Sequence, residues 1–337
     1  MGEQMKLLPY PDKPIFLCYH NKAFPMGVIQ ANAPGDITKW LCTKSINVSF
    51  NPNSPQNKFD LAIWDAWATA ERVITQQMFT LKKKLIPLIN VDLLSMFRTF
   101  IDHGCYIQGT YNEKHIPSKQ AYEVKDHNHD FLIIGYDDNN FESVGFVADG
   151  QFRHFKIPNQ NFIDAVTDTG SSRVGINFYS YKEGAIPIPN IERMLTDMDI
   201  YISTANQLDD SDETKTSYGI LALKRIKEFF LNEVVNNGKL YVDRRYSRVL
   251  YEHEWVLTQV INEFLDTNER NKYMSYAKVN LERAHLVHML GLKLSYTGNK
   301  DLIWRIVSNI EKIIEDEIKY IPDLLELLKT KHEKGII

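Results

Sequence analysis

The sequence has few cysteines and no long apolar run. Its 337 residues include three cysteines, Cys18, Cys42 and Cys105, which are too few and too odd in number for a disulfide framework. No stretch approaches the roughly 18 to 20 apolar residues of a membrane span. Residues 1–14 are polar and contain prolines, and they do not have the pattern of a signal peptide. We therefore expect reduced thiols, a cytoplasmic location and no membrane partner.

The chain also lacks an excess of basic residues. The formal net charge is -4, so no overall positive field favours nucleic acid. Apolar residues make up 44% and charged residues 24%, which is usual for a globular protein. The length allows one large domain or two smaller ones, each with its own core.

Hydrophobic periodicity changes along the chain. Up to about residue 185, helical spacing alternates with short runs rich in β-branched and aromatic residues. The pattern predicts helices at residues 21–30, 61–85, 91–102 and 161–166, and strands at 105–110, 131–136, 144–148 and 175–181. The class predicted for this half is α+β.

After Pro187 and Pro189 the strand pattern is replaced by amphipathic helices. These are predicted at residues 191–205, 216–235, 250–265, 273–296 and 302–328. We therefore predict two parts, an α+β domain at residues 1–185 and an α-helical region at residues 186–337.

The most informative segment begins at His129, which leads an apolar strand that ends at Tyr136. Residues 137–140 form an Asp/Asn turn, and a second run returns toward Asp149. The start of one antiparallel strand faces the end of the next, so His129 and Asp149 are predicted to be neighbours. A carboxylate beside an imidazole fixes its tautomer and stabilises the imidazolium, as in a nucleophilic triad.

The nucleophile predicted for this pair is Cys18. It lies just before a predicted helix, whose N–H groups and dipole favour a thiolate. Cys105 is the second candidate, and Cys42 is expected in the core. His127 and His129 lie on the same side of a strand, so they also allow a metal site with Asp149. Asp130 is expected on the opposite face.

Residues 104–107, 111–117, 129–138 and 147–149 resemble the BtrH-like family, named for the N-terminal domain of a butirosin biosynthesis protein. The resemblance extends over about residues 15–181. It includes residues 18–24, which look like the segment that carries the nucleophile, Cys18. It implies a papain-like fold, related to C39 cysteine peptidases, and a Cys18, His129, Asp149 triad.

The resemblance also implies an activity. Acyltransferases of this family move acyl groups from carrier-protein thioesters to amines in antibiotic and other natural-product biosynthesis. The implied partners are an acyl or peptidyl carrier protein, with its phosphopantetheine arm, and an amine substrate; no cofactor or metal is implied. Lys82–Lys84 and the arginines 244, 245 and 248 are basic clusters suited to an acidic carrier.

Two alternatives remain open on the residues alone. The same triad with water as the acceptor would make a cysteine peptidase or amidase. A chain that has lost the chemistry would be a binding protein whose working surface is the helical region.

Overall fold

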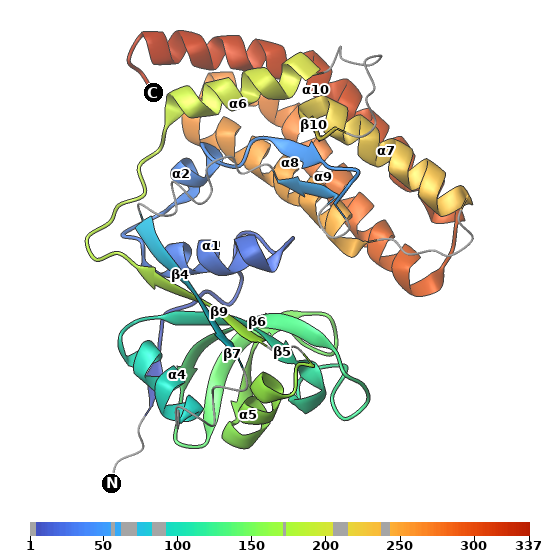
Figure 1. Ribbon diagram of the computed structural model, residues 1–337. Coiled ribbons are helices and arrows are strands. Elements are labelled where there is room, and N and C mark those ends of the chain that lie inside the picture. Colours follow the sequence, from blue (N-terminus) through green and yellow to red (C-terminus); the bar gives the residue numbers. More distant parts are fainter. Residues whose placement is uncertain are drawn as a thin grey trace. The chain divides into compact units, whose positions relative to one another are not determined.

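The computed structural model describes residues 5–54, 58–61, 73–82, 92–170, 173–204, 215–236 and 243–337. The chain is α+β, as predicted, and divides into two compact units (Figure 1). The first is drawn from Met1–Gly35 and Trp67–Ile186, and the second from Asp36–Ala66 and Pro187–Ile337. The described residues between 36 and 61, predicted to belong to the first half, therefore group with the helical unit.

The first unit is built on an antiparallel sheet. Its strand order is β4-β9-β5-β6-β7-β8, and β1 pairs with β6 outside this order. The strands are β1 (Lys6–Leu7), β4 (Ile74–Lys82), β5 (Tyr106–Asn112), β6 (Asn128–Tyr136), β7 (Asn140–Phe146), β8 (Phe152–Pro158) and β9 (Arg173–Tyr181). The β6–β7 turn forms because Oδ1 of Asp137 accepts hydrogen bonds from the backbone N–H groups of Asn139 and Asn140.

Helices cover both faces of this sheet (Figure 1). One face carries α1 (His20–Asn32), which contacts β9 and β6. The other carries α4 (Leu93–Asp102) and α5 (Asn159–Thr167). Phe162 holds this second layer together, with its ring centroid 4.9 Å from that of Phe97 and 4.4 Å from that of Phe141. All three rings are buried, so α4, α5 and β7 share one apolar core.

The predicted helix at residues 61–85 is wrong in its described part. Leu61 ends strand β3 (Phe59–Leu61), and residues 74–82 form β4; residues 62–72 and 83–85 lie outside the described residues. Nine consecutive residues of β4 pair with β9, from Ile74 opposite Tyr181 to Lys82 opposite Arg173. This long ladder supplies hydrogen bonds and cross-strand contacts that override a weak helical spacing.

The second unit is mainly helical. Its long helices are α6 (Ile191–Ser203), α7 (Gly219–Asn236), α8 (Arg244–Phe264), α9 (Thr267–Thr297) and α10 (Asp301–Glu333). The short helix α2 (Thr38–Cys42) packs on α8, and β10 (Ser217–Tyr218), β2 (Val48–Phe50) and β3 form a small sheet. No helix among the described residues is both long enough and apolar enough to span a bilayer.

Local sequence signals set the ends of these helices. At the start of α9, the Asp266 side chain accepts from the Glu269 N–H while the Glu269 side chain accepts from the Asp266 N–H. At its end, Gly298 takes a left-handed conformation with φ 66°. Gly219 at the start of α7 also has a positive φ, of 57°.

These two glycines give a matched test of the second unit. A Cβ at Gly219 would lie 2.3 Å from the Tyr201 carbonyl oxygen, whereas a Cβ at Gly298 would meet no atom within 4 Å. We expect Gly298→Ala to cost about 1–2 kcal/mol, the penalty of the left-handed backbone. Gly219→Ala adds an overpacking cost of about 1–3 kcal/mol. Thermal unfolding followed by circular dichroism measures the difference; equal shifts in both variants would contradict the predicted clash.

Candidate functional site

The first residues of α1 and β6 meet in the first unit. Nδ1 of His20, the first residue of α1, lies 2.8 Å from Oδ1 of Asp130 on β6. The His20 ring stacks between Phe24 and Phe146, with centroid distances of 4.6 and 5.4 Å, and its side chain is 9% exposed. These contacts hold the N-terminus of α1 against the start of β6.

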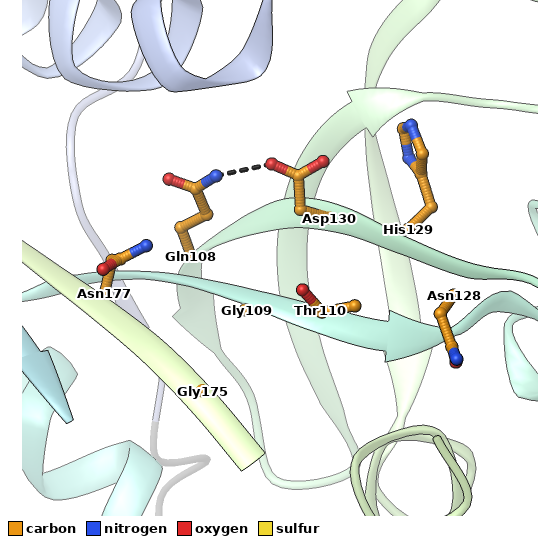
Figure 2. A pocket seen from close by; sticks show the side chains of 8 residues that line it. All are labelled: Gln108, Gly109, Thr110, Asn128, His129, Asp130, Gly175 and Asn177. Carbon is orange, nitrogen blue, oxygen red and sulfur yellow. Dashed lines mark hydrogen bonds between the residues drawn. The ribbon is translucent and has the colours of Figure 1, made fainter. Parts of the chain in front are cut away.

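Asp130 is held by a hydrogen-bonded relay that crosses the sheet. Its Oδ2 accepts from Nε2 of Gln108 on β5 (Figure 2), and Oε1 of Gln108 accepts from the hydroxyl of Tyr179 on β9. Burial by itself would raise the pKa of Asp130. The hydrogen bond from His20, the charges of His20 and His129 and the Gln108 bond outweigh it, and the pKa falls to about 2. Asp130 is therefore an ionised acceptor at neutral pH.

His129 is the second imidazole of this group. Its ring centroid lies 5.0 Å from that of His20, and its Nδ1 lies 3.6 Å from Oε1 of Glu113. Burial lowers the pKa of His129, and the charge of His20 lowers it further, against smaller opposing effects from Asp130 and Glu113. His129 is thus neutral at physiological pH, the state in which an imidazole can accept a proton.

A buried ion pair lies beside His129. Glu113 Oε1 is 3.2 Å from Lys119 Nζ, and both side chains are almost fully buried. Lys119 also donates to the Phe146 carbonyl and lies 4.9 Å from the centre of the Phe155 ring. The carboxylate of Glu113 lies 3.8 Å from Nε2 of His127 as well. Both histidines therefore face one carboxylate, in agreement with their predicted common side.

A small polar cavity opens beside this group. Its volume is about 200 Å³. It is lined by Gln108, Gly109, Thr110, Asn128, His129, Asp130, Gly175 and Asn177 (Figure 2). Ligand pockets for larger molecules usually occupy about 300–1,000 Å³. This cavity therefore suits a small polar group, such as an acyl carbonyl or an amine, held against His129 and Asp130.

Of the predicted catalytic residues, the structure places Cys18 and His129 at neighbouring segments. Cys18 lies two residues before His20, so the Cα atoms of Cys18 and His20 are at most about 7 Å apart. Cys18 is 2% exposed and does not line the cavity, whereas His129 does. Access to the thiol therefore depends on local movement of the residues that cover it.

Asp149 is not joined to His129. Its Oδ2 lies 2.8 Å from Arg153, and its Oδ1 accepts from the Gln151 N–H. Strand β7 ends at Phe146, and the following turn, closed by the Gly150 N–H to the Val147 carbonyl, takes Asp149 past the end of the ladder. The hairpin forms as predicted, but Glu113 and His20, instead of Asp149, are the polar neighbours of His129.

The prediction that Asp130 lies on the opposite face of the strand from His129 is wrong. Although strand residues alternate in direction, ligand atoms of His20, His129 and Asp130 lie within 4.8 Å of one another. His129 is the second residue of β6, at the beginning of the strand. A metal ion at this site would be held by these three residues, and not by the set of His127, His129 and Asp149 that the sequence suggests.

Burial opposes a thiolate at the other two cysteines as well, and neither of them precedes a helix as Cys18 does. Cys42 belongs to the second unit, and burial raises the pKa of its thiol well above the usual range. Burial also raises the pKa of Cys105. Sequence reasoning missed Gln108, Glu113 and Lys119, because their neighbours come from segments that only the sheet and the adjoining turns bring together.

Comparison with models of known protein families finds no match to this chain, and comparison with curated proteins finds no relative. The function therefore rests on the site itself.

The two imidazoles allow a direct test of the site's electrostatics. We expect His129 to titrate below 6.5, the ordinary histidine value, and His20→Asn to move its pKa upward, because a neighbouring positive charge is removed. His103→Asn, at an exposed residue that contacts the Thr99 carbonyl, is the control. NMR titration of the imidazole Cε1–H signals measures both; an unchanged His129 titration in His20→Asn would contradict the coupling.

Proposed function

We propose that this protein is a cysteine-dependent acyltransferase of papain-like architecture that joins an acyl group to an amine. The observation that carries the proposal is the contact between His20 and Asp130. It brings the helix start that follows Cys18 to the strand start that bears His129. A helix N-terminus favours a thiolate, and a neutral imidazole nearby can receive the thiol proton.

The reaction has two halves. The Cys18 thiol passes its proton to His129, and the thiolate attacks the carbonyl carbon of an acyl thioester. The donor thiol leaves with the proton from His129, and the acyl group remains on Cys18. An amine then attacks this new thioester and loses a proton to His129, which returns it to the departing Cys18 sulfur. The product is an amide, and the first half exchanges one thioester for another.

The local charges suit this cycle. His129 must become an imidazolium between the two proton transfers, and the ionised Asp130 and the nearby Glu113 stabilise that charge. Glu113 lies 3.6 Å from Nδ1, and a hydrogen bond formed there during the cycle would hold the tautomer in which Nε2 accepts the proton. In this mechanism the oxyanion would be stabilised by the backbone N–H of the nucleophile, Cys18.

The proposed donor is an acyl or peptidyl carrier protein, whose thin arm suits a small cavity. Of the basic clusters suggested for docking, Lys83 and Lys84 and the side chain of Lys82 lie outside the described residues. The arginine cluster is largely neutralised. Arg245 pairs with Asp243, and Arg248 pairs with Glu252 at 2.6 Å. The described arginines therefore offer less net positive charge than the sequence suggests.

A second candidate function is metal-assisted hydrolysis at the same site. Nε2 of His20 is buried and has no hydrogen-bond partner among the described residues. His20 is also one of the three residues whose ligand atoms lie close enough to hold an ion. A bound cation would activate water without any role for Cys18. The peptidase alternative keeps Cys18 and uses water as the acceptor.

Intact-mass spectrometry separates these functions. After incubation with acyl thioesters, we expect a covalent acyl adduct that Cys18→Ala abolishes and Cys105→Ala retains. Because the nucleophile carries the covalent step, Cys18→Ala should lower turnover by at least about 10³-fold. Loss of activity on treatment with a chelator, with Cys18→Ala still active, would instead favour metal-assisted hydrolysis. Release of free acid in place of amide would favour a peptidase or amidase.

Glu113 and Asp149 are alternative partners for His129, and a pair of variants tests them. We expect Glu113→Gln to lower kcat by about 10²–10⁴-fold, because tautomer control and imidazolium stabilisation are lost. Asp149→Asn should change kcat little, because Asp149 contacts Arg153 instead. Steady-state kinetics with circular dichroism as the folding control measures this. The reverse order of effects would return the orienting role to Asp149.

A further inference from the structure

A second group of ionisable residues lies inside the helical unit, away from any solvent. His253 and Glu254 are consecutive on α8, and Glu317 lies on α10. All three side chains are fully buried. Tyr201 of α6 and Tyr320 of α10 are also buried and adjoin them, as their shared electrostatic interactions show. Carboxylates are rarely buried so completely unless they are paired or bind a metal.

The hydrogen bonds present satisfy only part of this group. The Tyr201 hydroxyl donates to Oε2 of Glu317 at 2.7 Å and lies 3.0 Å from Nε2 of His253. Among the described residues, no hydrogen-bond partner is present for either carboxylate oxygen of Glu254, for Oε1 of Glu317 or for Nδ1 of His253. Both carboxylate oxygens of Glu254 and one of Glu317 are thus left unsatisfied, although each would cost about 1–3 kcal/mol or more without a partner.

The charges of Glu254 and Glu317 are a second reason to expect a bound cation. The charge of Arg283 acts on Glu254, but this guanidinium also pairs with Asp316 at 2.5 Å and donates to Asn280, so it supplies only part of a counter-charge. If both glutamates were ionised, their two negative charges would need a counter-charge in this buried site. One divalent cation would balance them.

The geometry fits a metal ion. Ligand atoms of His253, Glu254 and Glu317 lie within 4.8 Å of one another. Nε2 of His253 is 3.4 Å from Oε1 of Glu317. Two ligands at about 2.1 Å from a tetrahedral ion are themselves about 3.4 Å apart. Imidazole nitrogen with carboxylate oxygen is a donor set suited to Zn²⁺ and related first-row ions.

We propose that His253, Glu254 and Glu317 bind one divalent transition-metal ion, which fastens α8 to α10. The Tyr201 hydroxyl, which bonds Glu317, orients that carboxylate. The site is structural, because it is closed to solvent and leaves no path for a substrate. It is independent of the cysteine chemistry proposed for the first unit.

The competing arrangement is a proton shared between the two glutamates. Burial raises the pKa of Glu254, and the neighbouring Glu317 raises it further, so a protonated Glu254 could hydrogen-bond to Glu317. Substitution of Glu254 by glutamine distinguishes the two arrangements. Glutamine resembles a protonated glutamate, so Glu254→Gln preserves the shared-proton network but removes a metal ligand.

The experiment uses the full chain carrying His20→Asn and His129→Asn, so that the other candidate cluster binds no metal. Metal-free protein is titrated with Zn²⁺ and with Mn²⁺, and bound metal is measured by inductively coupled plasma mass spectrometry. We expect one ion per chain and a rise in Tm on binding. Because this readout uses no substitution at the site, it holds even where a site variant fails to fold.

Substitutions then locate the ion. In the same background, Glu254→Gln and Glu317→Gln should weaken binding at least tenfold, and Tyr201→Phe by about 10-fold or more. Glu315→Gln, at an exposed residue of α10, is the matched control and should bind as its parent does. No bound metal in the parent, with the Tm of Glu254→Gln unchanged or raised, would overturn the proposal in favour of the shared proton. Metal retained by both glutamine variants would also overturn it.

Discussion

The contact between His20 and Asp130 is the constraint on which the candidate site depends. It joins residues 110 positions apart and places the start of α1 at the start of β6. Stacking on Phe24 and Phe146 limits rotation of the His20 ring, and Gln108 with Tyr179 limits that of Asp130. The pair is therefore held from both sides, which is what the chemistry proposed for Cys18 and His129 requires.

Burial sets the chemistry of the surrounding groups. It favours a neutral His129, yet the hydrogen bonds to Asp130 keep that carboxylate ionised. Two groups side by side on β6 thus differ in charge because their partners differ. His129 can therefore accept a proton while Asp130 stays negatively charged, and acid–base chemistry requires two such groups with different protonation states. The small cavity beside them is lined mainly by polar residues.

The two units use buried polar groups in different ways. In the first, Glu113 and Lys119 are buried but paired, and the cavity exposes His129 to a ligand. In the second, Glu254 and Glu317 are fully buried, and three of their carboxylate oxygens have no hydrogen-bond partner among the described residues. The first arrangement leaves His129 open to a ligand, whereas the second joins α8 and α10 only through the ion that we propose.

Local signals in the sequence determined much of the architecture. The helices of the second half, the hairpin around Asp137, and the α+β class follow from periodicity, turn residues and caps, because these act over a few neighbouring residues. Tertiary structure decided the rest. Strand β4 formed against its helical spacing because β9 pairs along its whole length. The partners of His129 also could not be read from spacing. Asp149 was turned away by the end of β7, while His20 and Glu113 were brought in by packing between distant segments. Sequence specifies which side chains are available, but only the folded chain decides which of them meet.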